Sequence, residues 1–111
     1  MPTKKTAKSK YNKTTLDISS ESLTDLPSDL LRYTKLKTLD CYHNNITNID
    51  RHNLPPHLKV LNCSVNNITE LDNLPDSLLY LECANTHITE LDNLPKIPET
   101  GQWVGVTYKN K

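Results

Sequence analysis

Apolar residues recur along this 111-residue chain with a period of 20 to 22 residues. Leu39, Leu61 and Leu81 mark successive copies, and in each copy a Cys follows two residues later and an Ile five residues after the Cys. The copies read LKTLDCYHNNITNID, LKVLNCSVNNITELD and LLYLECANTHITELD, and a less regular copy, TTLDISSESLTDLP, precedes them in the same register. One such unit cannot bury its own apolar face, so the pattern predicts units that stack on one another.

Within each copy, the LxxLxC segment alternates apolar and polar residues, which is the period of a β-strand. Stacked units would pair these strands in one parallel sheet, with neighbouring strands about 4.8 Å apart. The rest of each unit has no room for a full helix. A Pro opens each of these outer segments, at Pro27, Pro55, Pro75 and Pro95, and Pro disfavours regular hydrogen-bonded structure. We therefore expect extended chain or a single helical turn there.

The pattern LxxLxCxxNxI at this period resembles the leucine-rich repeat, and its shortest subclass in particular, similar to repeats of bacterial type III effectors and of large amoeba-infecting viruses. The resemblance implies an α/β-type leucine-rich-repeat solenoid. It would have a short parallel β-sheet on the concave face and a mostly irregular or extended convex side with little helix. The domain prediction is a disordered Lys-rich tail over 1–12, about four repeats over 13–98, and a degenerate capping coil with a tail over 99–111.

Asn44 and Asn66 fall where the chain leaves the strand and bends. An Asn side chain offers both donors and an acceptor to backbone groups that the sheet leaves unpaired there. The resemblance implies an Asn ladder at these two positions. The first copy has Glu21 in this slot and the last has Thr86, so we expect the end repeats to be less regular.

The C-terminal segment PETGQWVGVTYKNK fits a fifth, degenerate unit. In this register Trp103 stands in the column of Cys residues and closes the stack, since an open end would expose apolar side chains and a strand edge. The alternative makes Trp103 an exposed anchor for a partner.

The charges cancel overall, with thirteen Lys and Arg and thirteen Asp and Glu, but they are unevenly placed. Residues 1–13 carry five Lys and no acid, while residues 14–98 carry six basic and twelve acidic side chains. Zero net charge argues against a protein that mainly coats nucleic acid. The tail is interpreted as solubilising, with nuclear import or a nucleic-acid contact as the alternative.

No recognisable constellation predicts an enzyme, a metal site or a cofactor. The three Cys lack CxxC spacing and are expected to be reduced core thiols, with a zinc or disulfide site as the alternative. The His residues form no HExxH motif, there is no glycine-rich phosphate loop, and no Ser has an activating context. Asp17, Asp40 and His43 could share one surface, where we expect solvated side chains and not a catalytic triad.

The outward face of the predicted sheet is the candidate binding surface. One of its columns is mostly acidic, two Tyr stand beside that column, and Lys residues line one margin. The candidate residues are Asp17, Lys37, Asp40, Tyr42, His43, Lys59, Asn62, Tyr80 and Glu82. Tyr is enriched at protein interfaces, and acidic columns suit a partner with a basic surface.

The sequence therefore predicts an intracellular, monomeric protein-interaction module of the cytoplasm or nucleus, without catalysis and without nucleic-acid or membrane partners. It lacks a secretory signal and any apolar run long enough to span a membrane. A ubiquitin-ligase adaptor is the alternative, because LPSDLLRYTKL at 26–36 resembles the opening of an F-box.

Overall fold

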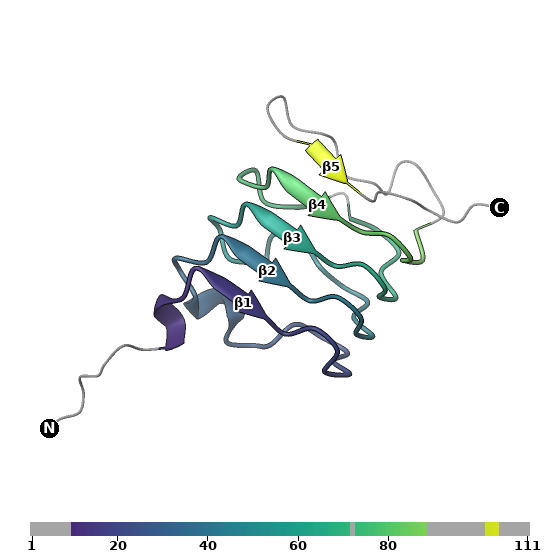
Figure 1. Ribbon diagram of the computed structural model, residues 1–111, viewed down its shortest axis with the longest axis horizontal. Coiled ribbons are helices and arrows are strands. Elements are labelled where there is room, and N and C mark those ends of the chain that lie inside the picture. The colour runs from purple at the N-terminus through teal and green to yellow at the C-terminus, as the bar shows by residue number, and fades with distance from the viewer. Residues whose placement is uncertain (1–9, 72, 89–101, 105–111) are drawn as a thin grey trace, which may run out of the picture.

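The chain forms one parallel five-stranded sheet with almost no helix, as the computed structural model shows (Figure 1). The structure describes residues 10–71 and 73–88, and the backbone of residues 102–104. The strands are β1 Thr15–Asp17, β2 Thr38–Asp40, β3 Val60–Asn62, β4 Tyr80–Glu82 and β5 Gln102–Val104, paired in chain order. Two single-turn 3-10 helices, η1 Lys10–Asn12 and η2 Leu30–Arg32, precede β1 and β2. Within the described residues, no helix has the length and apolar character needed to cross a membrane.

The strand register follows the sequence repeat. Leu16 pairs with Leu39, Leu39 with Leu61, and Leu61 with Leu81. Leu39, Leu61 and Leu81 are completely buried, whereas Leu16 in the first strand is only partly buried. Successive residues of a strand point to opposite faces, so each central Leu points into the core and its two neighbours point outward.

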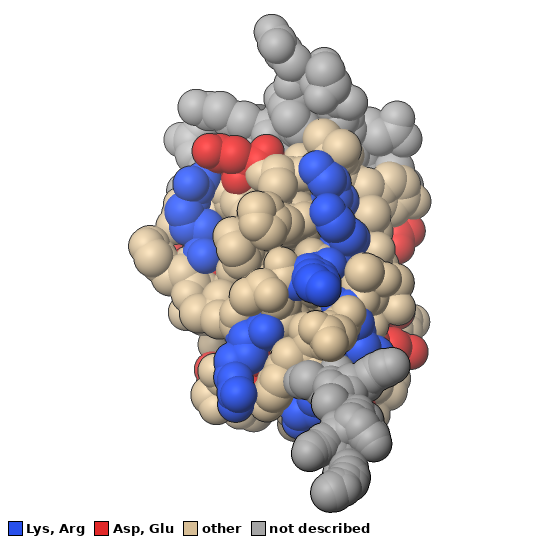
Figure 2. Space-filling view, turned by 90° about the vertical axis from the view of Figure 1, so that its left-hand side faces the viewer, with Lys and Arg blue, Asp and Glu red and all other residues tan. Residues whose placement is uncertain are grey.

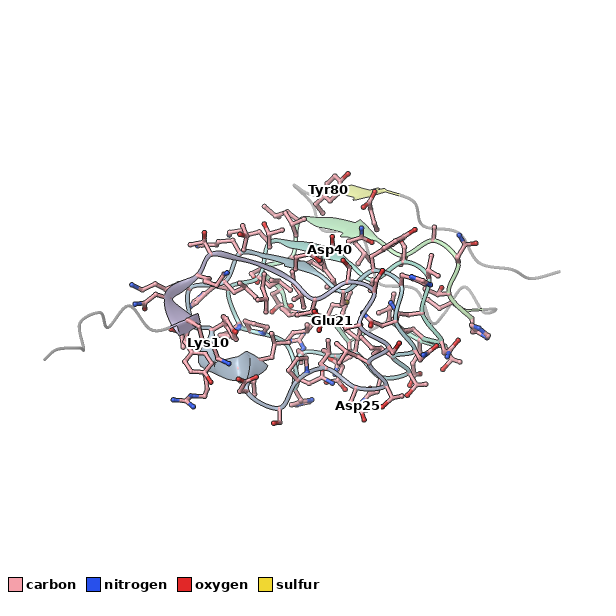
Figure 3. All side chains as sticks on the ribbon, turned by 60° about the horizontal axis from the view of Figure 1, so that its bottom comes forward. Lys10, Glu21, Asp25, Asp40 and Tyr80 are labelled. Atoms are coloured by element: carbon pink, nitrogen blue, oxygen red, sulfur yellow. The ribbon has the colours of Figure 1, made fainter. Side chains whose placement is uncertain are left out.

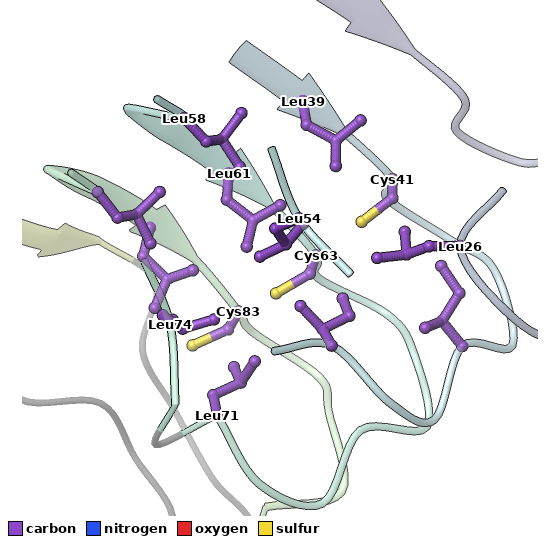
Figure 4. Close-up of a cluster of buried hydrophobic side chains, with 14 of the residues drawn as sticks. Leu26, Leu39, Cys41, Leu54, Leu58, Leu61, Cys63, Leu71, Leu74 and Cys83 are labelled. Atoms are coloured by element: carbon purple, nitrogen blue, oxygen red, sulfur yellow. The ribbon is translucent and has the colours of Figure 1, made fainter. Parts of the chain in front are cut away.

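The core lies on one side of the sheet, under the strands and the segments that follow them. Figure 4 shows the Cys side chains that follow β2, β3 and β4 side by side among the leucines. Cys41, Cys63 and Cys83 are free thiols with no exposed surface. Burial raises the pKa of Cys41 to about 12 and that of Cys83 to about 11, and it raises the pKa of Cys63 well above its ordinary value. At neutral pH these residues are protonated core side chains.

The outer segments begin with a repeated turn instead of a helix. In each of three repeats, the amide of a Leu donates to the carbonyl of a Pro three residues earlier: Leu30 to Pro27, Leu58 to Pro55, and Leu78 to Pro75. Only the first of these turns continues into a helical turn, η2. Residues 26–36 belong to this repeat: Leu30, Tyr33 and Leu36 are all buried in the core.

Residues 10–12 differ from the prediction of a disordered tail over 1–12, because they form η1. Tyr11 is partly buried and packs edge-to-face against Tyr33 with 5.0 Å between ring centroids. Its hydroxyl donates to Asp29 at 2.9 Å, and the Arg32 guanidinium lies 4.3 Å from its ring centroid. These contacts hold η1 against η2. Residues 1–9 lie outside the described part of the chain.

The register of β5 corrects the prediction for Trp103. Trp103 pairs with Leu81, so its backbone continues the central Leu column and not the Cys column. An interval of 20 residues, as between Leu61 and Leu81, would instead place Trp103 level with Cys83. The last interval is 22 residues, the same as that between Leu39 and Leu61. The other predicted features of residues 99–111 lie outside the described residues.

Candidate functional site

The outward face of the sheet carries an acidic row that crosses four strands. The row consists of the last residue of each strand: Asp17, Asp40, Asn62 and Glu82. These residues are direct register partners, as predicted from the repeat. Asp17 is exposed and the other three are half-buried. The row therefore places three carboxylates and one amide at intervals of one strand spacing, about 4.8 Å.

Three members of the row also shape the bend that follows their own strand. One side-chain oxygen of Asp17, Asp40 and Asn62 accepts a hydrogen bond from the amide two residues later, at 3.0, 3.1 and 3.1 Å. Asp and Asn are the residues that form such turns. This second role is visible in the sequence, because each Asp or Asn stands at the end of an expected strand, directly before a bend.

The Asp17 carboxylate is the most strongly engaged member of the row. The Ser19 hydroxyl donates to it at 2.6 Å and the Ser19 amide at 3.0 Å. Because these hydrogen bonds favour the ionised form, they hold the pKa of Asp17 below its ordinary value. The row therefore keeps this negative charge under mildly acidic conditions.

Two tyrosines flank the row from different sides. Tyr42 lies two residues beyond Asp40 and leaves 43% of its surface exposed. Tyr80 opens β4 and is half-buried. Figure 3 labels Asp40 and Tyr80 on the outward side of the sheet, away from the core. The structure thus brings together the acidic row and both Tyr residues.

His43 lies in the bend after β2 and not on the sheet face itself. Its backbone has a φ of 60°, and its ring lies 5.9 Å from that of Tyr42. Its Nδ1 is 3.2 Å from the Ser20 hydroxyl. The hydrogen bonds of Asp17 and Asp40 go instead to Ser19 and Tyr42. The described residues therefore do not assemble Asp17, Asp40 and His43 into a triad.

Lys37 and Lys59 stand directly before β2 and β3, and both are exposed. They line the margin of the sheet opposite the acidic row, as predicted. The sheet thus has cations along the margin where the strands begin and carboxylates where they end. In the part of the chain that the structure describes, no group of three His, Cys, Asp or Glu residues is placed to hold a metal ion.

The Asn ladder is present at both predicted positions. Asn44 is 6% exposed and Asn66 is 3% exposed. The Asn44 side chain accepts hydrogen bonds from the amides of Glu21 and Leu23 and donates to the carbonyls of Ile18 and Cys41. Asn44 thus connects the first two repeats.

Asn66 connects the second and third repeats in the same way. It accepts from the Ile46 amide at 2.9 Å and donates to the carbonyls of Cys41 and Cys63. In the next repeat, among the described residues, the Thr86 hydroxyl donates to the carbonyl of Cys83, within its own repeat. The ladder fixes the backbone from which the acidic row and Tyr42 project.

Comparison of the chain with protein-family models, with curated proteins and with solved structures found no match.

Proposed function

We propose that the chain is a short leucine-rich-repeat solenoid that binds a protein partner through the outward face of β1–β4, without catalysis. The observation that carries this proposal is the register of Asp17, Asp40, Asn62 and Glu82 in one row, with an exposed Tyr42 beside it. The repeat register and the buried Asn residues support the solenoid assignment.

A row of this kind suits a protein segment that carries Lys or Arg. Carboxylates on neighbouring strands repel one another in the free protein, and cations of a partner relieve that repulsion. Tyr adds a large contact area at a small cost in side-chain entropy. The hydrogen bonds of the bends and of the Asn ladder hold these side chains in position before binding, which lowers the entropy cost of association.

The test is a paired pull-down with mass spectrometry that compares the intact chain with Asp40→Asn/Tyr42→Ser. These substitutions introduce the residues that the next repeat has at the same positions, Asn62 and Ser64, so the fold accommodates them. Asn also keeps the side-chain oxygen that accepts the amide of residue 42, as Asn62 does for Ser64.

The matched control is Glu70→Gln/His87→Ser, which removes one charge and one ring from exposed positions away from the row. We expect the proteins captured by the intact chain and by the control to be lost with Asp40→Asn/Tyr42→Ser. Identical captures by all three proteins would contradict binding through the outward face.

A further inference from the structure

Cations gather where the chain leads into the strands. Six of the seven described Lys and Arg residues are exposed and precede a strand by six residues or fewer: Lys10, Lys13, Arg32, Lys35, Lys37 and Lys59. We call this set the basic edge. The seventh, Arg51, is paired with Asp76 at 3.2 Å. Figure 2 shows Lys and Arg side chains following one another along this side of the molecule, with few carboxylates between them.

The two lysines at the centre of the basic edge are regularly spaced because they occupy equivalent positions of the sequence repeat. Lys37 and Lys59 hold equivalent positions before β2 and β3, and the Lys59 amide donates to the Lys37 carbonyl at 2.8 Å. Their backbones are therefore one strand spacing apart, about 4.8 Å. Within the described residues neither of them forms an ion pair, whereas Lys10 lies 3.5 Å from Asp29. Two cationic side chains that start one strand spacing apart repel each other, and an anion bound between them relieves that repulsion.

The segment that precedes the basic edge in the sequence is also positively charged. Residues 1–9 hold Lys4, Lys5 and Lys8 and no acid, and they join the basic edge at Lys10. A chain of zero net charge thus concentrates nine of its thirteen basic residues in this edge and the segment attached to it. Local density of charge, and not the net charge, decides whether a polyanion binds.

We propose that the basic edge binds the phosphate backbone of a single-stranded nucleic acid. Cations in a line along the sheet match a linear polyanion, and Lys contacts phosphates without reading sequence. Tyr80 lies beside the line, because its amide donates to the Lys59 carbonyl at 3.0 Å. Tyr80 is half-buried, and its aromatic side chain on the outward face offers a base a surface for stacking.

An anionic membrane is the competing partner, and the geometry favours nucleic acid. Insertion into lipid needs a continuous apolar surface next to the cations. Among the residues that the structure describes, the exposed leucines near the basic edge are Leu31, which precedes β2, and Leu79, which precedes β4. The β3 repeat with Lys59 lies between them, so they do not form one patch.

The test measures fluorescence anisotropy of a labelled 12-nucleotide oligothymidylate titrated with the full chain over a series of salt concentrations. Each phosphate contact on a single strand contributes about −0.7 to the slope of log K against log salt concentration. We expect Lys37→Glu/Lys59→Glu to lower affinity at least tenfold and to make the slope shallower by about 1.4. Tyr80→Ala should lower affinity about tenfold and leave the slope unchanged.

The control is Lys109→Glu/Lys111→Glu, which changes net charge by the same amount at positions outside the described residues. We expect it to bind within twofold of the intact chain. Equal losses in both double variants would overturn the proposal, since net charge alone would then explain them. So would absence of oligonucleotide binding at 50 mM salt, or binding only to phosphatidylserine vesicles. Circular dichroism checks that the variants are folded. The pull-down on Asp40 and Tyr42 tests other residues, so the two proposals can fail separately.

Discussion

The two ends of the strands use polar residues in opposite ways. Beyond the strand ends, Asn44 and Asn66 are buried, and their side chains form hydrogen bonds with backbone groups of two repeats. Before the strands, Lys37 and Lys59 are exposed and form no ion pair with a described residue. The two buried Asn residues after the strands are therefore committed to the fold, whereas the two lysines before the strands are available to a ligand.

The backbone explains this difference. At the start of the strands, the carbonyls of Thr14, Lys37 and Lys59 each accept two amides of the next repeat, so these three carbonyls pair within the main chain. After the strands, the chain bends sharply through residues with positive φ: Ser20, His43, Val65 and Asn85. The bend buries amides and carbonyls that the ladder of strands no longer pairs, and side chains must satisfy them.

Breaking the Asn ladder should have the largest effect on stability. Asn66→Ala removes the acceptor of the Ile46 amide, the Asn66 donor to the Cys63 carbonyl, and one of the two Asn donors to the Cys41 carbonyl. We expect the free energy of unfolding to fall by about 3 kcal/mol, because buried groups left unpaired cost about 1–3 kcal/mol each. Urea denaturation measures this. The control is Asn67→Ala at an exposed position next to it; equal losses in both variants would contradict the structural role of Asn66.

Alkaline pH should lower the stability of the folded protein through the column of three buried Cys residues. The folded-state pKa values are raised, to about 12 for Cys41 and about 11 for Cys83. The folded protein thus binds more protons than the unfolded chain above pH 8.5, and stability falls as pH rises toward these values. We expect a loss of between about 1 and 2 kcal/mol for each thiol at pH 10.

Denaturation at pH 7.5 and at pH 10 measures this loss. In Cys41→Ala, the difference in the free energy of unfolding between the two pH values should be smaller by the amount expected for one thiol. The same burial predicts that a thiol reagent labels the native protein at pH 7.5 only as fast as the protein unfolds. Rapid labelling of the folded protein would show that the column is open to solvent.

A smaller effect should come from the strained bend. Val65 has a φ of 58°, in the left-handed region that is unfavourable for a β-branched residue. The next repeat has Asn85 at this position with a φ of 55°, and Asn tolerates this conformation better. We expect Val65→Asn to be more stable than Val65→Ala by about 1 kcal/mol. Thermal denaturation of the two variants compares them, and a more stable Val65→Ala would refute the strain argument.

The smallest effect should come from the other end of the strands. Lys37→Ser/Lys59→Ser removes two exposed cations that pair with no described carboxylate, so the free energy of unfolding should change by less than about 0.5 kcal/mol. Urea denaturation measures this change. If the loss approached that of Asn66→Ala, the two ends of the strands would not differ in the way described.

Much of the sheet could be predicted from the sequence, because the repeat fixes which residues are equivalent. The pairing of Leu39 with Leu61 and Leu81 and the acidic row follow from the repeat interval alone. The position of Trp103 did not, because intervals of both 20 and 22 residues occur and nothing in the sequence chooses between them. The ordered turn at residues 10–12 was missed because Tyr11 finds its partners, Tyr33 and Asp29, 18 or more residues away.

The amino-acid sequence by itself determined the repeat, the buried Leu and Cys columns and the positions of Asn44 and Asn66, since the spacing of apolar and polar residues carries these properties. Only the tertiary structure decided what each polar side chain does. It engaged Asp17, Asp40 and Asn62 in bends, placed His43 beside the Ser20 hydroxyl, and left the lysines before the strands in solvent. The physical reason is that a side chain's role depends on which backbone groups around it remain unpaired, and this is settled only when neighbouring repeats stack.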